Sequence, residues 1–294
     1  MAFAEIYQKR WIMDKKTAKD LSVKAIDLRK TVLEMIRKSG GGHIGGDFSV
    51  METLVVLYND VMNISPENKD DPDRDYFIMS KGHSVESYYA VLADRGFFDT
   101  KELVDSFSQF GSKFIGHPNN EIDGVEMNSG SLGHGLPVSV GMALGLRMDK
   151  SPSRVYTVMG DGELAEGSVW EGFMAAGHYK LGNLCAVVDR NHLQISGTTE
   201  EVMTHENLHR QVEDFGWNVL EVNGNSIEEL SDAFCLAKGV TDMPTLIIAN
   251  TIKGFGGGEI MENNVSWHHH VPDNEEYEKI IAALDNRKEA LINE

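Results

Sequence analysis

The chain has 294 residues, of which 41% are hydrophobic and 25% are charged, an ordinary composition for a globular protein with a sizeable core. Its formal net charge of −19 argues against partners such as nucleic acid or anionic membrane surfaces. No apolar run approaches the ~20 residues of a membrane span, and the start MAFAEIYQKR lacks the apolar core of a secretion signal. Cys185 and Cys235 are expected to be buried reduced thiols, so we predict a cytoplasmic protein. From the length of the chain we predict a single domain over residues 1–294.

Helical patterns dominate the first part of the chain. Apolar periodicity predicts helices over residues 17–39, 49–62 and 101–110, with another that follows His83 and runs through Arg95. The triple glycine 40–42 ends the first helix. Residues 65–75 read as a polar surface loop, and a strand is expected over residues 76–79.

A long irregular stretch over residues 111–137 follows. It is rich in Gly, Asn and Ser, and it contains Gly116-His117-Pro118 and the segment SGSLGHG over residues 129–135. Irregular segments of this length inside a compact domain are usually functional or disordered. We therefore expect part of a binding site here.

The central unit of the chain is a predicted βαβ motif. Apolar, β-branched runs predict strands over residues 155–159 and 184–188, and helical spacing predicts a helix over residues 168–179 between them. Such a unit implies two parallel strands with a right-handed crossover. The polar turns Gly160-Asp161-Gly162 and Asp189-Arg190-Asn191 then leave the carboxyl ends of these strands, where ligands of open parallel sheets bind.

Two oxygen-bearing side chains in these turns indicate a cation site. Asp161 and Asn191 each offer a hard oxygen ligand, and an irregular segment after Asn191 can add a backbone carbonyl. Together with phosphate oxygens, these ligands suit octahedral Mg²⁺ that holds a diphosphate. Taken alone, a GDG sequence is usually only a turn. Asn191 after the second strand makes the cofactor interpretation the stronger one.

The rest of the chain continues the same alternation. Helices are predicted over residues 138–148, 227–238 and 275–291, strands over residues 217–222 and 245–249, and a loop over residues 253–258. We therefore predict an α/β fold with a doubly wound, mostly parallel sheet flanked by helices.

Four histidines lie in predicted loops: His43, His83, His117 and His268. Isolated loop histidines are more often structural, but neutral imidazoles suit a site that binds diphosphate and sugar hydroxyls and moves protons near neutral pH. Zinc binding by His268-His269-His270 is the rival interpretation. Consecutive histidines do not share one face, and no HxxxH or CxxC companion supports it.

The central unit resembles the cofactor-binding half of transketolase, through GDGELAEG, AGHYKLGNL and DRNHLQISG over residues 160–197. Gly42-His43, Lys81-Gly82-His83 and Gly116-His117-Pro118 resemble the family's three histidine motifs. The resemblance covers nearly the whole chain. His134 departs from it, because single-chain family members more often have Gln there.

The resemblance implies thiamine diphosphate and Mg²⁺ as cofactors, with Ca²⁺ or Mn²⁺ as possible substitutes. It implies catalytic roles for His43, His83, His117, Glu166 and Glu171. It implies cofactor contacts at His83, Gly130, Ser131, Leu132, Gly160, Asp161, Gly162, Glu163, Asn191 and His268, and metal binding by Asp161, Asn191 and the carbonyl of Leu193. Because His269 and His270 follow directly, the match of His268 to the family's diphosphate-contacting histidine is uncertain by one position. Glu166 and Glu171 would lie at a subunit interface, whereas their spacing alone favours an ordinary exposed helix face.

The same resemblance leaves part of a complete enzyme unaccounted for. The family's pyrimidine-binding domain supplies the activating glutamate and the arginines for sugar phosphate, and neither it nor the C-terminal domain is found in this sequence. The chain thus looks like the N-terminal subunit of a split transketolase, with a C-terminal transketolase subunit in an α₂β₂ assembly. It would transfer a two-carbon ketol unit from a ketose (phosphate) donor to an aldose acceptor through a thiamine diphosphate carbanion.

Two alternatives stay open at this stage. One is a specialised-sugar transketolase or a deoxyxylulose-phosphate synthase-like subunit. The other is a non-catalytic chain, either a regulatory subunit or a nucleotide-binding module. The intact pair Asp161 and Asn191 argues against a degenerate subunit, and the absence of a P-loop or GxGxxG after a first strand argues against a nucleotide module.

Overall fold

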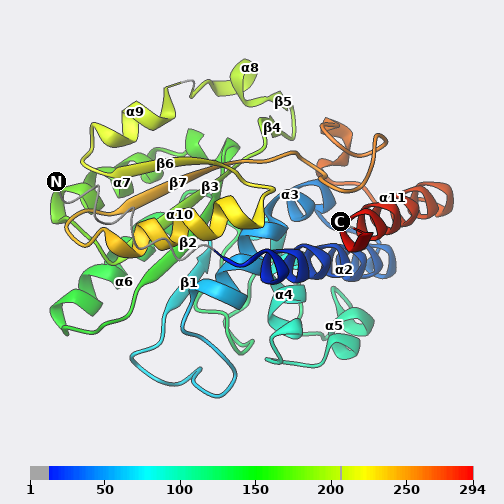
Figure 1. The fold of residues 1–294 in the computed structure, drawn as a ribbon, viewed down its shortest axis with the longest axis horizontal. Helices are drawn as coiled ribbons and strands as arrows, with labels where there is room; N and C mark the ends of the chain where they lie inside the picture. The colour runs from blue at the N-terminus through cyan, green and yellow to red at the C-terminus, as the bar shows by residue number, and fades with distance from the viewer. Residues whose placement is uncertain (1–12, 206, 294) are drawn as a thin grey trace.

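A five-stranded parallel sheet lies at the centre of the computed structural model, which describes residues 13–205 and 207–293 (Figure 1). The strand order is β1-β2-β3-β7-β6, and all four neighbouring pairs are parallel. The strands are β1 (Tyr76–Met79), β2 (Val155–Gly160), β3 (Leu184–Arg190), β6 (Asn218–Asn223) and β7 (Thr245–Asn250). The predicted α/β fold with a parallel sheet is confirmed.

Helices cover both faces of this sheet because its inner strands are apolar on both sides. Along β2, Tyr156 and Val158 pack into one core, whereas Val155 and Met159 pack into the other. The first core is covered by α2 (Lys15–Ser39), α3 (Ile44–Val56), α4 (Val85–Asp94) and α10 (Ile227–Gly239), and the second by α6 (Gly135–Met148), α7 (Gly167–Tyr179) and α9 (Leu208–Glu213). The sheet is therefore doubly wound, as predicted.

The helix after the first histidine motif begins earlier than predicted. The pattern predicts a start at residue 49, but α3 begins at Ile44, directly after His43. Gly45 and Gly46 are poor helix formers, which hides this first turn from the pattern. A Cβ atom at Gly45 would lie 2.6 Å from the carbonyl oxygen of Trp267, so close packing requires glycine here. A π-helical turn, Leu57–Val61, ends the element.

Other helix boundaries differ by smaller amounts. The helix predicted over residues 101–110 is α5 (Thr100–Ser106), and it stops where Ser108 takes a left-handed conformation with φ of 54°. Helix α6 begins at Gly135, three residues earlier than predicted, because Pro137 is tolerated in a first helical turn. Helix α11 (Asn274–Asn293) closes the described chain and packs against α2 (Figure 1).

The sequence-based expectations about thiols and membranes have mixed outcomes. Both cysteines are free thiols, but only Cys185 is buried, because Cys235 lies half-buried on α10. Within residues 13–205 and 207–293, no helix is long and apolar enough to cross a membrane. The start MAFAEIYQKR lies outside the described residues.

Two glycines in neighbouring helices give opposite predictions for substitution by alanine. A Cβ atom at Gly177 in α7 would lie 1.8 Å from the Phe215 carbonyl oxygen, whereas one at Gly141 in α6 meets nothing within 4 Å. Gly177→Ala should therefore lower the free energy of unfolding by about 1–3 kcal/mol because the backbone must shift. Gly141→Ala should raise it by up to about 1 kcal/mol through helix propensity. Urea denaturation of both variants is the check, and an unchanged midpoint for Gly177→Ala would contradict the packing.

Candidate active site

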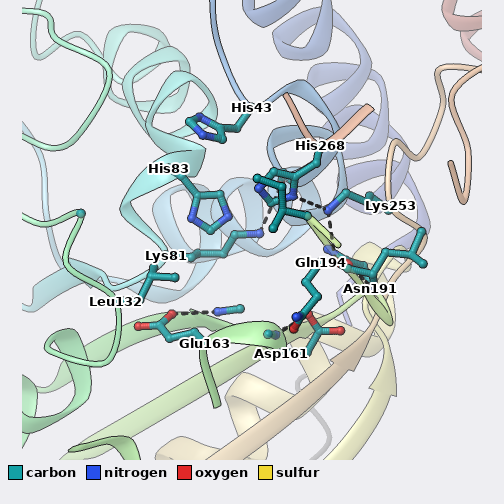
Figure 2. Close-up of a pocket in the computed structure, with 16 residues that line it drawn as sticks. His43, Lys81, His83, Leu132, Asp161, Glu163, Asn191, Gln194, Lys253 and His268 are labelled. Atoms are coloured by element: carbon teal, nitrogen blue, oxygen red, sulfur yellow. Dashed lines mark hydrogen bonds between the residues drawn. The ribbon is translucent and has the colours of Figure 1, made fainter. Parts of the chain in front are cut away.

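A pocket of about 350 Å³ opens at the carboxyl edge of the sheet, beyond the ends of β2 and β3. It is lined by His43, Gly46, Lys81, His83, Gly130, Leu132, Gly160, Asp161, Gly162, Glu163, Asn191, Leu193, Gln194, Ile195, Lys253 and His268. Figure 2 shows the histidines on one side of the pocket, with Asp161 and Glu163 on the other. Parallel strands bring this edge together, as the βαβ pattern predicted.

Most of the residues singled out from the sequence line this pocket, but four do not. His117 lies beside it, with its ring 6.2 Å from the ring of His43. Ser131 is exposed and is not part of the lining. Glu166 and Glu171 are exposed at the start of α7, also outside the lining. Their predicted interface role stays a prediction.

Asp161 is held in a fixed orientation at the end of β2. Its two carboxylate oxygens accept hydrogen bonds from the backbone N–H groups of His192 (2.6 Å) and Gly162 (2.8 Å). Burial, followed by the negative charge of Asp189, raises the pKa of Asp161 to about 6. A buried carboxylate of this kind gains from a cation placed against it.

Asn191 and Leu193 supply two further oxygens near Asp161. The amide of Asn191 donates to the Ser49 hydroxyl (3.2 Å), and its oxygen accepts from the Leu193 N–H (3.1 Å). Leu193 begins the short β4–β5 hairpin (Leu193–Gln194 and Gly197–Thr198). Its carbonyl oxygen accepts a hydrogen bond from the Lys253 ammonium group (3.1 Å). Among the described residues there is no group of three or more His, Cys, Asp or Glu side chains that could hold a metal ion. One carboxylate and two neutral oxygens suit a cation that also takes phosphate ligands.

Two lysines reach the pocket in different charge environments. Lys81 is buried and forms an ion pair with Asp189 at 2.5 Å. Lys253 instead lies 3.0 Å from the Nδ1 atom of His268, and its ammonium group meets no carboxylate within ion-pair distance in the described chain. Burial, followed by repulsion from Lys81, lowers the pKa of Lys253 to about 8. An anion placed beside Lys253 would restore its charge.

The histidines form one cluster around His43. Its ring centroid lies 5.3 Å from that of His83, 5.7 Å from His268 and 4.8 Å from His269. Burial lowers the pKa of His43 to about 4, with repulsion from His269 as the next cause. Burial also lowers the pKa of His268 to about 3 and that of His83 well below its usual range. These imidazoles are therefore neutral, and they can donate to hydroxyls or phosphate oxygens as well as accept.

The three consecutive histidines separate clearly in the structure. His268 lines the pocket, and His269 lines a smaller neighbouring cavity with His43 and His117. His270 turns away and contacts Glu276 at 2.8 Å. Of the three, His268 is the one that lines the pocket, and its contact with a diphosphate stays a prediction.

Comparison with known proteins gives the family of the chain. Residues 19–284 match the family described as transketolase, thiamine diphosphate binding domain. The chain belongs to the transketolase family. It is 46% identical over 266 residues to an apulose-4-phosphate transketolase subunit of Phocaeicola vulgatus, covering 90% of this chain and 94% of that protein.

Further relatives of the chain differ in length. The 6-deoxy-6-sulfo-D-fructose transketolase subunit SqwG of Clostridium sp. is 39% identical over 267 residues, which cover 90% of this chain and 96% of that protein. Human transketolase is 38% identical over 242 residues, which cover 82% of this chain but only 38% of that protein. The transketolase structure from Campylobacter jejuni matches with a TM-score of 0.80 at 28% identity, over 93% of this chain and 48% of that one.

The pocket suits the diphosphate end of the cofactor that this family domain binds. Lys253 and His268 line the cavity, and neither forms an ion pair with a carboxylate in the described chain. Asp161, Asn191 and the Leu193 carbonyl offer oxygens for a metal ion. Glu163 lines the same cavity, but its carboxylate accepts from Ser80, Gly133 and Gly160. These bonds favour a role in joining the loops of this transketolase domain.

Five lining residues were not predicted as site residues from the sequence: Gly46, Lys81, Gln194, Ile195 and Lys253. The positions of the two lysines after predicted strands could have marked them as site residues. Lys81 lies two residues after β1 and Lys253 three residues after β7, so both lie at the carboxyl ends of parallel strands. Gln194 and Ile195 follow the turn after β3, and nothing in their residue type marked them.

Asp161→Ala should abolish Mg²⁺-dependent binding of thiamine diphosphate, because it removes the only carboxylate among the three metal-facing oxygens. Calorimetry on the full chain with and without Mg²⁺ measures this. Asp242→Ala is the matched control, since Asp242 is exposed in the turn before β7 at the opposite edge of the sheet. Retained affinity in Asp161→Ala would contradict the metal assignment.

Proposed function

We propose that this chain is the diphosphate-binding subunit of a two-chain transketolase that transfers a two-carbon ketol unit from a specialised ketose phosphate or related sugar to an aldose. The observation that carries the proposal is the pocket, in which groups that can bind a diphosphate lie beside a cluster of neutral histidines. Similarity to proteins that are themselves named as transketolase subunits, over 94–96% of their length, supports the division into two chains.

The residues of this chain would divide the work in two. Asp161, Asn191 and the Leu193 carbonyl would hold Mg²⁺, while the Lys253 ammonium group would neutralise charge on the diphosphate and the neutral His268 ring would donate a hydrogen bond to it. Bound thiamine diphosphate supplies the electron sink for cleavage of the bond beside the ketose carbonyl. His43, His83 and His117 bind sugar hydroxyls and, being neutral, can accept and return a proton.

A partner subunit completes the site in this proposal. The residues that line the pocket include two lysines but no arginine and no Phe, Tyr or Trp. We infer that a C-terminal subunit supplies the pyrimidine-binding half and the arginines for sugar phosphate, in an α₂β₂ assembly in the cytoplasm. Glu166 and Glu171, exposed on α7, would then lie at an interface, and residues 1–294 would form the diphosphate-binding domain alone.

The names of the relatives favour an unusual sugar over the common pentose phosphates. Two relatives are named for apulose 4-phosphate and one for 6-deoxy-6-sulfo-D-fructose. The test is ketol transfer with Mg²⁺ and thiamine diphosphate from these donors and from xylulose 5-phosphate, with ribose 5-phosphate and other aldose phosphates as acceptors. It is run on this chain alone and with a C-terminal transketolase subunit from the same genome. Transfer only with both chains supports the proposal, and transfer by this chain alone would contradict it.

His117→Ala should reduce kcat of the two-chain enzyme by about 10²-fold while changing thiamine diphosphate affinity little, because His117 lies outside the diphosphate pocket. Steady-state kinetics and cofactor titration measure the two effects separately. His178→Ala, an exposed position on α7, is the control. Equal losses of turnover and cofactor affinity would contradict the role of His117 in substrate handling.

A further inference from the structure

Two buried carboxyl groups lie behind the first histidine loop and take no part in the site described above. Asp47 stands in the first turn of α3 and is 0% exposed, and Glu86 stands in the first turn of α4 and is 1% exposed. Within the described residues, no ion pair joins either carboxyl to a lysine, arginine or histidine. Buried carboxylates without a cation are costly, so this pair requires an explanation.

The contacts of the pair imply that it holds a proton. One oxygen of Asp47 accepts from the Ser87 N–H at 2.8 Å. Its other oxygen, Oδ2, and Oε2 of Glu86 are both buried and have no hydrogen-bond partner among the described residues, and the two carboxyl groups lie close enough for each to shift the pKa of the other. Two ionised carboxylates buried this close would repel each other, so one of them must be protonated.

Glu86 also reaches the loop that carries His43. Its carboxyl group lies against the backbone of the loop at His43. A Cβ atom at Gly42 would lie 2.5 Å from Oε1 of Glu86, so the loop can pass this closely only as glycine. Because the ring of His43 is the centre of the histidine cluster, a displaced loop would disturb its contacts with His83 and His268.

We propose that Glu86, protonated and donating to the Asp47 carboxylate, is a positioning residue that holds the His43 loop for substrate binding. Its effect on turnover rests on the proposed function, whereas the shared proton does not. Glu86 also lines the smaller cavity of about 250 Å³ together with His43, His117 and His269.

The charge environment agrees with a proton held on the pair. Burial, followed by the charge of Asp47, raises the pKa of Glu86 well above its usual range, and burial raises the pKa of Asp47 to about 7. The other titratable groups facing the pair are His43 before α3, Lys81 before α4, Tyr89 on α4, and His117 and His269 across the cavity. Lys81, the lysine among them, is already paired with Asp189.

The sign of the pH effect on stability follows from these directions. In the unfolded chain both carboxyls ionise near pH 4, whereas in the folded chain they keep protons to higher pH. The folded state therefore binds more protons, and the pair's contribution to stability is lost as the pH rises from about 4 through 7. Glu86→Gln removes one of these groups while keeping a donor for Asp47 and an acceptor beside the His43 loop.

The experiment compares Glu86→Gln, Glu86→Met and, as a control, Glu289→Gln at an exposed position on α11. From pH 5 to pH 8, the melting temperature of Glu86→Gln should rise by about 2–4 °C relative to wild type. That of Glu289→Gln should stay level with wild type. A relative fall for Glu86→Gln would overturn the shared proton, because it would mean that Glu86 is ionised in the folded protein.

The second readout is kinetic, on the two-chain enzyme. Glu86→Gln should keep kcat/KM within about threefold of wild type, and Glu86→Met should lose about tenfold or more while cofactor affinity changes little. Equal damage by Gln and Met would overturn the positioning role. If no donor sugar supports ketol transfer, the proposed function fails, while the melting temperatures still decide the protonation of Glu86.

Discussion

The buried ion pair between Lys81 and Asp189 is the interaction on which the site depends. It joins the carboxyl ends of β1 and β3, and both side chains are almost fully inaccessible, at 2% and 1% exposure. Asp189 also accepts from Ser49 of α3 and from Thr251 after β7. Charges removed from water in this way need each other and further hydrogen bonds, so the pair fixes the strand ends and α3 relative to one another.

This pair also sets the electrostatics of the pocket above it. Asp189 contributes to the raised pKa of Asp161, and Lys81 contributes to the lowered pKa values of Lys253 and His83. Because Lys81 is already neutralised, the pocket is left with neutral histidines, with Lys253 at a lowered pKa, and with one carboxylate that favours a cation. A magnesium diphosphate answers both needs at once, which explains how a strongly acidic chain carries an anion site.

Much of this arrangement could be predicted from the sequence, because its key residues stand at the ends of recognisable elements. The strand–turn–helix–strand pattern placed Asp161 and Asn191 at one sheet edge, where the structure has them. The first turn of α3 was missed because Gly45 and Gly46 weaken the helical signal, while the reason for them, the Trp267 carbonyl, lies more than two hundred residues away. Asp47 and Glu86 were missed for a similar reason, since burial and tertiary partners decide their roles.

The proton balance of thiamine diphosphate binding is the measurement that tests the pocket most directly. Calorimetric titration of the full chain with Mg²⁺ and cofactor at pH 8, in two buffers of different ionisation enthalpy, gives the number of protons exchanged. With a pKa of about 8, Lys253 is half protonated at this pH, so binding should take up about half a proton per site, and Lys253→Met should abolish the uptake. Binding without proton uptake, or uptake unchanged in Lys253→Met, would contradict the assignment of this pocket to the diphosphate.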